Sequence, residues 1–193
     1  MRQADEPRGG DGRFSERENV RAVCGGGVST RGRYQGHGIG LVDDKGRVAI
    51  PNALRTTLQQ NAPRADGKDG GTIVIGPHES NECLVAYDPA YVEIKAVQLD
   101  AHEAEHTAAD GSYDFNYQRR VMAGEAVPFD GSGRFIMPAF PRFHANIGQY
   151  AFFQGINNRI EIWDPATALA DPSLDKVTKK MIRFYMAEKG VEL

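Results

Sequence analysis

Residues 41–55 read LVDDKGRVAIPNALR, and residues 128–142, 87 positions further on, read PFDGSGRFIMPAFPR. Both stretches fit the pattern apolar-Asp-x-x-Gly-Arg-apolar-x-apolar-Pro-x-x-x-Arg. A supersecondary unit that recurs at a fixed offset is the sequence signature of a repeated architecture. The sequence therefore predicts two matched halves that share one structural plan.

The likeness between the halves continues downstream of these stretches. Residues 73–76 (IVIG) and 83–89 (CLVAYDP) correspond to residues 152–155 (FFQG) and 159–165 (RIEIWDP). Short alternating apolar runs that are bounded by turn residues are typical of strands. Each half is therefore predicted as two strands around a tight turn, a short helix after the proline, and two more strands. The first two strands are expected at 39–42 and 47–50 in one half, and at 126–129 and 134–137 in the other.

The turns and helix starts have recognisable residue types. Gly46 and Gly133 close the Asp-x-x-Gly segments, where glycine adopts a positive φ at little cost. Each half then ends in an aromatic-Asp-Pro sequence. Asp88 and Asp164 are predicted to cap helices whose first position is the following proline.

The remaining segments complete the expected domain organisation. Residues 1–30 are Gly-rich with few large apolar side chains, which predicts a disordered arm. An alternative is that translation starts further downstream, so that residues 1–27 are absent from the native protein. The expected divisions are 1–30 (arm), 31–88 (first repeat), 89–125 (linking helices), 126–164 (second repeat) and 165–193 (C-terminal helical segment). The last helix, near 174–188, should present Val177, Met181, Ile182 and Tyr185 on one face.

Composition excludes several classes of protein. The 193 residues carry a net charge of −3, and 40% of them are hydrophobic, which is typical of a soluble globular chain. No apolar run approaches the roughly 18 residues of a membrane span. Two cysteines are too few for a disulfide framework, so we expect a cytoplasmic protein. Residues 1–36 hold seven arginines and five acids, so the rest of the chain has a net charge of −5. DNA binding would therefore require a local basic surface.

The repeat resembles the MraZ family of bacterial transcriptional regulators. The resemblance covers roughly residues 31–165. It depends on the two Asp-x-x-Gly-Arg segments, each followed by apolar-x-apolar-Pro, and on the Gly-x-x-Asn-x-Ile-Glu-Ile-Trp sequence that ends at Trp163. The stretch 31–43 is longer and richer in Gly than is usual in the family.

The resemblance implies a fold, a partner and a set of site residues. Its fold is α+β and β-rich, a double-split β-barrel built from two swapped-hairpin repeats with flanking helices. Its members assemble into homo-oligomeric rings and bind direct repeats of double-stranded DNA in the promoter of a cell-division and cell-wall operon, which they usually repress. This implies a nucleoid-associated protein without a cofactor. The DNA-contacting motifs correspond here to Asp43 with Arg47 and to Asp130 with Arg134.

The chemistry of these side chains leaves two interpretations open. Arg47 and Arg134 follow tight turns, where a guanidinium can bind phosphate or the O6 and N7 atoms of guanine. Lys45 at the turn tip is expected to add a phosphate contact. Equally, each Asp and Arg can form a structural bridge across the turn, since the turn places them close together. Upstream, Arg33 is expected to support DNA contact from a flexible basic edge that includes Arg31.

Two other functions are weighed against DNA binding. The sequence His102-Glu103-Ala104-Glu105-His106 matches the short motif of zinc metalloproteases, in which Glu103 would be the general base. Its flanks are polar, and no third ligand follows at a familiar spacing, so we expect no enzymatic activity and no metal. The second alternative is a ring-shaped protein-binding scaffold with weak DNA binding, which the acidic body favours.

Overall fold

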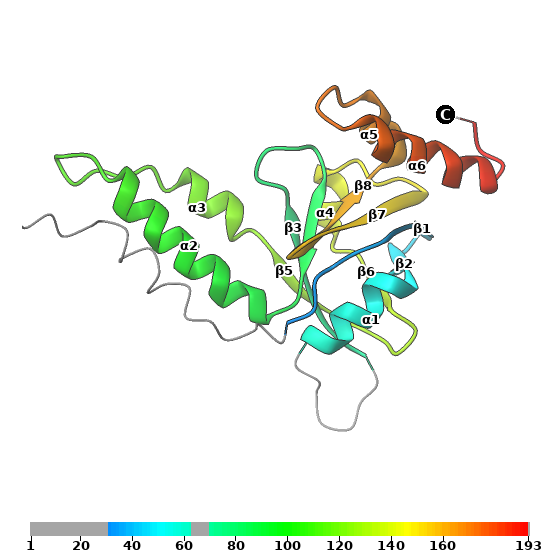
Figure 1. The fold of residues 1–193 in the computed structure, drawn as a ribbon, viewed down its shortest axis with the longest axis horizontal. Coiled ribbons are helices and arrows are strands. Elements are labelled where there is room, and N and C mark those ends of the chain that lie inside the picture. Colours follow the sequence, from blue (N-terminus) through cyan, green and yellow to red (C-terminus); the bar gives the residue numbers. More distant parts are fainter. Residues whose placement is uncertain (1–30, 63–69, 193) are drawn as a thin grey trace, which may run out of the picture. The chain divides into compact units, whose positions relative to one another are not determined.

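A computed structural model describes residues 31–62 and 70–192, which belong to the unit Arg31–Leu193 (Figure 1). The predicted disordered arm at residues 1–30 lies outside the described residues. No helix of the described ranges is long and apolar enough to cross a membrane.

The two Asp-x-x-Gly segments form the same tight turn. The amide of Gly46 donates a hydrogen bond to the carbonyl of Asp43 at 2.9 Å, and Gly133 donates to Asp130 at 2.8 Å. Both glycines have φ of 78°, a conformation that costs other residues steric strain. The turn chemistry predicted from the sequence is confirmed at both positions.

Each half contains four strands and one helix between its second and third strand. The first half consists of β1 (His37–Leu41), β2 (Arg47–Ala49), α1 (Asn52–Asn61), β3 (Gly71–Pro77) and β4 (Leu84–Tyr87). The second half consists of β5 (Glu125–Phe129), β6 (Arg134–Ile136), α4 (Ala139–His144), β7 (Tyr150–Ile156) and β8 (Arg159–Trp163). The linking helices are α2 (Ala90–His106) and α3 (Asn116–Val121), and the C-terminal helices are α5 (Pro165–Ala170) and α6 (Lys176–Glu188).

The six-stranded sheet has a strand order that is unchanged when the two halves are exchanged. All its neighbouring strands are antiparallel, in the order β1-β7-β8-β4-β3-β5. The first strand of each half therefore pairs with the third strand of the other half, as Figure 1 shows for β1 beside β7. The fourth strands, β4 and β8, pair with each other at the centre.

The second strands form a separate ribbon, in which β2 pairs with β6. Backbone hydrogen bonds extend this pairing to the turn of the opposite half. The amide of Ile50 donates to the carbonyl of Gly133 at 2.9 Å, and the amide of Met137 donates to the carbonyl of Gly46 at 2.9 Å. Each turn is therefore held by the other half of the chain.

The main hydrophobic core lies between the ribbon, α1 and the sheet. Both halves contribute to it, with side chains such as Val48, Leu54, Phe135, Phe153 and Ile160. Burying each such side chain contributes about 1.5–3 kcal/mol relative to leaving it in water. The shared core and the exchanged strands make the two halves dependent on each other.

The α+β, strand-rich class predicted from the sequence is confirmed, and so are two linking helices with a break near Gly111. The division into repeats at 31–88 and 126–164 stays a prediction. Of the two predicted helix caps, one is wrong and one is confirmed. Asp88 does not cap α2 with its side chain, because its carboxylate accepts a hydrogen bond from the hydroxyl of Tyr34 at 2.8 Å and pairs with Arg31. Asp164 does cap α5, through the amide of Thr167.

The buried face of α6 agrees with the prediction except at one position. Ile182 is buried, and Met181 and Tyr185 pack against the same core, whereas Val177 is 60% exposed. Thr178 and Met186 are buried as well. The polar Thr178 is buried because its hydroxyl bonds to both Gln154 and Asp175. The apolar pattern therefore identified most of this face but not the buried threonine.

Candidate nucleic-acid interface

The β2–β6 ribbon presents two different faces. Its register pairs Val48 with Phe135, and these two side chains are 2% and 3% exposed because they face the core. Side chains of a strand alternate between its two faces. The outward face therefore carries the other four residues of the ribbon, which are Arg47, Ala49, Arg134 and Ile136.

Both candidate arginines are accessible and share this outward face. The side chains of Arg47 and Arg134 are 60% and 68% exposed. They occupy equivalent positions in the two halves, and each lies opposite an apolar residue on the neighbouring strand. The ribbon thus brings together two side chains that are 87 residues apart in the sequence.

Each arginine is anchored through one nitrogen only. Nε of Arg47 lies 2.6 Å from Oδ2 of Asp43, and Nε of Arg134 lies 2.8 Å from Oδ2 of Asp130. Among the residues that the structure describes, none bonds to Nη1 or Nη2 of either arginine. Both terminal nitrogens of each fork are therefore available to a ligand, and their direction is set by the bond at Nε.

The aspartates hold the turns as well as the arginines. Oδ1 of Asp43 accepts the backbone amides of Lys45 at 2.9 Å and Arg47 at 2.8 Å. Oδ1 of Asp130 accepts the equivalent amides of the second turn. The pKa of each carboxyl is held below its ordinary value of 3.8, chiefly by the hydrogen bond from the backbone amide of its arginine. The hydrogen bond from the arginine side chain lowers both pKa values further. Asp43 and Asp130 therefore stay ionised at neutral pH.

The remaining predicted residues occupy different positions. Lys45 is exposed at the tip of the first turn, beside the ribbon. Arg33 precedes β1, whereas Asp43 follows that strand, and the guanidinium of Arg33 bonds to the side chain of Asn158. The structure therefore does not bring Arg33 to the ribbon. Arg31 is not part of a flexible edge, since its side chain is only 11% exposed and pairs with Asp88.

Formal charges around the ribbon nearly cancel. The three cations Lys45, Arg47 and Arg134 are balanced by the three carboxylates of Asp43, Asp44 and Asp130. The net formal charge at the ribbon itself is therefore zero. Arg55 and Arg142 flank the ribbon and keep their positive charges, because their side chains donate to the neutral backbone carbonyls of Ser132 and Ile147. The ribbon itself is neutral and attracts a polyanion weakly from a distance, so binding there depends on direct contacts and on these two flanking charges.

The outward face of the ribbon borders a groove of about 1040 Å³. Its walls are the ribbon itself, the two Asp–Arg pairs and the ends of β1 and β5. Leu41 and Ile136, both lining the groove, are large apolar side chains that remain 59% and 57% exposed. The groove therefore combines the guanidinium groups of Arg47 and Arg134 with exposed apolar surface.

The protease-like motif has the partners of an ordinary helix face. Nδ1 of His102 lies 2.8 Å from the hydroxyl of Tyr113, and its ring stacks on those of His106 and Tyr117. The carboxylate of Glu103 accepts a hydrogen bond from Gln118. Within residues 31–62 and 70–192, no group of three His, Cys, Asp or Glu side chains is placed to hold a metal ion.

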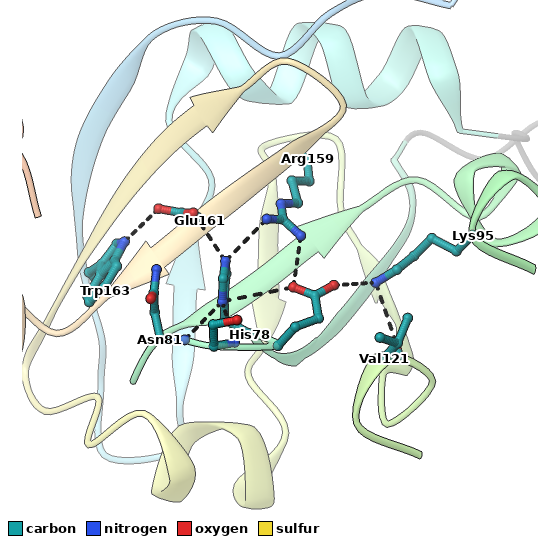
Figure 2. A network of polar contacts seen from close by, with 9 residues as sticks. His78, Asn81, Lys95, Val121, Arg159, Glu161 and Trp163 are labelled. Carbon is teal, nitrogen blue, oxygen red and sulfur yellow. Dashed lines mark hydrogen bonds and ion pairs between the residues drawn. The ribbon is translucent and has the colours of Figure 1, made fainter. Parts of the chain in front are cut away.

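A second polar cluster was missed by the sequence analysis. Glu79 lies between the ammonium group of Lys95, at 3.2 Å, and the guanidinium of Arg159, at 2.9 Å. The guanidinium of Arg159 also contacts Nε2 of His78, which joins His78 to the same network (Figure 2). Nδ1 of His78 accepts the amides of Ser80 and Asn81. These residues come from the β3–β4 connection, α2 and β8, and no sequence motif links them.

Burial determines the electrostatics of this cluster. Desolvation lowers the pKa of Lys95, whose side chain is 5% exposed. For Glu79, burial alone would raise the pKa, but its own backbone amide and the adjacent Arg159 and Lys95 lower it overall. Every buried polar side chain of the described residues has a hydrogen-bond partner. The cluster is therefore a satisfied structural network that fixes α2 against the sheet.

Comparisons with known proteins identify relatives over most of the chain. No protein-family model matches it. The chain is 31% identical over 161 residues to the transcriptional regulator MraZ of Syntrophobacter fumaroxidans, covering 82% of this chain and 97% of that protein. It is 30% identical over 139 residues to the transcriptional regulator MraZ of Ruegeria pomeroyi, covering 70% and 79%. A third relative, the transcriptional regulator MraZ of Rhodospirillum rubrum, is 32% identical over 131 residues, covering 66% and 76%.

Proposed function

This chain belongs to the MraZ family of transcriptional regulators, and on that premise we propose that it binds double-stranded DNA through the outward face of its β2–β6 ribbon. The relatives named as transcriptional regulators support a regulator of transcription rather than an enzyme.

One observation carries the proposal more than any other. Arg47 and Arg134 lie on the same face of one two-stranded ribbon, with exposed forks whose Nε atoms are anchored and whose terminal nitrogens have no partner among the described residues. The major groove of B-DNA admits a two-stranded β-ribbon. In that groove an arginine fork contacts guanine bidentately, and Lys45 at the turn tip contacts phosphate.

The finer features of the function follow from the same premise. The exchange of first strands between the halves supports a double-split β-barrel of two swapped-hairpin repeats, with boundaries at 31–88 and 126–164. We extend the proposal to a homo-oligomeric ring that binds direct repeats in the promoter of a cell-division and cell-wall operon and represses it in the nucleoid. A locally neutral ribbon binds weakly alone, and linked sites can gain roughly 10²–10⁴ in affinity.

A protein-binding scaffold is the second candidate function, and α4 is the observation that favours it. Phe140 and Phe143 on this helix are 58% and 80% exposed. In the DNA-binding proposal this apolar face instead serves contacts between copies of the chain.

Gel-shift and anisotropy titrations with DNA from directly upstream of the protein's own coding region test the proposal. Each bidentate contact contributes about 1–3 kcal/mol, so the double substitution Arg47→Ala/Arg134→Ala should weaken binding at least about tenfold. Circular dichroism should remain unchanged, because both side chains point away from the core. The matched control is Lys180→Ala/Arg183→Ala on the exposed side of α6, which removes the same charge.

Three results would contradict the proposal. Wild-type protein that shifts no DNA at low salt favours the scaffold. Equal weakening by the control pair would show that only overall charge matters. Unfolding of the Arg47→Ala/Arg134→Ala variant would show that these arginines mainly stabilise the turns rather than contact DNA.

A further inference from the structure

The outward face of the ribbon is nearly, but not fully, symmetric. Exchanging the two halves places Arg47 on Arg134, and it places Ala49 on Ile136. The register then gives two cross-strand pairs, Arg47 with Ile136 and Arg134 with Ala49. The two pairs have the same charge and differ only in the size of the apolar partner.

The larger partner is left uncovered by the fold. Ile136 is 57% exposed, although it is a bulky aliphatic side chain in the centre of the candidate interface. Its neighbours in the ribbon that face the other way, Val48 and Phe135, are almost fully buried. The folded chain therefore gains little from an isoleucine at this position, whereas a ligand with an apolar group would gain from covering it.

DNA offers one such group in the major groove. The C5-methyl of thymine is the apolar feature on base edges there, and guanine presents the acceptors that suit an arginine fork. Directly opposite residues of an antiparallel pair have Cβ atoms about 4.5–5.5 Å apart, and base pairs stack about 3.4 Å apart. Arg47 and Ile136 therefore reach the same or adjacent base pairs.

Building on the proposed function, we infer that Ile136 contacts a thymine methyl group beside the guanine read by Arg47, and that this contact sets the direction in which the ribbon lies along DNA. At the symmetry-related position, Ala49 is too short for an equal contact. A fully symmetric ribbon would fit its site equally well in both directions. Because Ile136 and Ala49 differ in size, the two directions of binding differ in affinity.

The turns carry a second difference with the same consequence. The first turn has Lys45 at its tip, and the equivalent position in the second turn is Ser132. A lysine contact to phosphate is thus available at one end of the ribbon only. A ribbon with a fixed direction suits sites repeated in the same orientation, because every copy then lies the same way along the DNA.

Selection from a pool of random DNA duplexes tests the inference with three proteins. Wild type should enrich thymine next to guanine on one side of the site. Ile136→Ala should keep the guanines and lose the thymine. Ala49→Ile/Ile136→Ala should regain the thymine, because the exchanged ribbon binds the same site in the opposite direction. These side chains point outward, so the variants should retain the wild-type circular dichroism and thermal midpoint.

A chemical substitution in the DNA provides the second measurement. Replacing the enriched thymine with uracil removes only the methyl group. Burying one such group is worth about 0.8 kcal/mol, so wild type should lose roughly fourfold in affinity. Ile136→Ala should bind the thymine and uracil duplexes equally.

The possible outcomes separate this inference from the proposed function. If Ile136→Ala enriches the same sequence as wild type, or if uracil has the same effect on wild type and Ile136→Ala, Ile136 does not read thymine, and DNA binding still stands. If wild type binds no duplex at all, the proposed function fails and the inference fails with it.

Discussion

At the scale of single residues, Asp43 and Asp130 combine two tasks that are usually considered separately. In each, one carboxylate oxygen accepts the backbone amides of the turn, and the other holds Nε of the arginine. The structural bridge and the exposed cationic fork are therefore not alternatives. The aspartate closes the turn, and the same bond aims the arginine outward.

These carboxyls make stability depend on pH with a definite sign. Their pKa values are lower in the folded protein than the ordinary 3.8, chiefly through the arginine amide of each turn. A carboxyl with a depressed pKa contributes stability above its unfolded pKa and loses it as the pH falls through the folded value. Asp43→Asn/Asp130→Asn should therefore have a lower thermal midpoint than wild type at neutral pH.

The difference between the two thermal midpoints should shrink as the pH falls below 3.8, the ordinary value for these carboxyls. Scanning calorimetry of both proteins from pH 7 to pH 3 measures it. Comparing the two proteins removes the contribution of other acidic groups, such as Asp110 and Asp175. A difference that grows toward low pH would have the opposite sign and would contradict the assignment.

At the scale of elements, the sequence predicted where strands and turns occur but not which strands pair. Alternating apolar residues identify a strand and the face that it buries. They carry no information about the partner, so the pairing of β1 with β7 could not be read from residues 37–41. The exposed position of Arg47 and Arg134 follows from local alternation, whereas their shared face required the β2–β6 register.

The local errors have a similar origin. Asp88-Pro89 has the sequence of a helix cap, but Tyr34 and Arg31, more than 50 residues upstream, engage the carboxylate. The Glu79 cluster likewise joins segments up to 81 residues apart (Figure 2). Side-chain partners over such distances are set by the tertiary fold, which no short motif encodes.

The tight turns provide a prediction at this scale. Alanine at Gly133 would have φ of 78°, and its Cβ would lie 2.7 Å from Cδ of Arg55. Gly111 has a similar φ of 81° with no atom within 4 Å of such a Cβ, so it serves as the control. Gly111→Ala should lower the free energy of unfolding by about 1–2 kcal/mol, and Gly133→Ala should lower it more.

Urea unfolding of the two variants measures this difference. Adding Arg55→Ala to Gly133→Ala should recover part of the excess, because it removes the clashing carbon. An equal loss of unfolding free energy in Gly111→Ala and Gly133→Ala would show that the positive φ alone causes it. The new Cβ at position 133 would then be accommodated without a steric clash with Arg55.

The buried cluster supplies another prediction. Glu79→Leu leaves the ammonium of Lys95 with the carbonyl of Val121 as its remaining hydrogen-bond partner, at 3.4 Å. Breaking a buried ion pair in this way should cost about 3 kcal/mol of unfolding free energy. Glu79→Leu/Lys95→Met should cost less than Glu79→Leu alone, because no unpaired ammonium remains. Urea titrations of the single and double variants measure both values, and a double variant that is less stable than Glu79→Leu would contradict this account.

At the scale of the whole molecule, the proposed function makes DNA affinity depend on how many ribbons act together, because each ribbon is neutral by itself. A protein that assembles into a ring engages a second site on the same DNA at high effective concentration. A duplex with two copies of the site should therefore bind at least about 100-fold more tightly than a duplex with one copy. Anisotropy titrations at one salt concentration, with light scattering to give multiples of the 21.2 kDa chain mass, measure both quantities. Equal affinity for the two duplexes, or a monomeric mass, would contradict the ring.

The palindromic strand order also has a consequence for synthesis on the ribosome. β1 is synthesised well before its partner β7, which begins at Tyr150. Likewise, β4 cannot pair until β8, which ends at Trp163, has been synthesised. A nascent chain that has not reached Trp163 holds unpaired strand edges, which favour aggregation while they persist. The first half therefore cannot complete its strand pairing until Trp163 has been made.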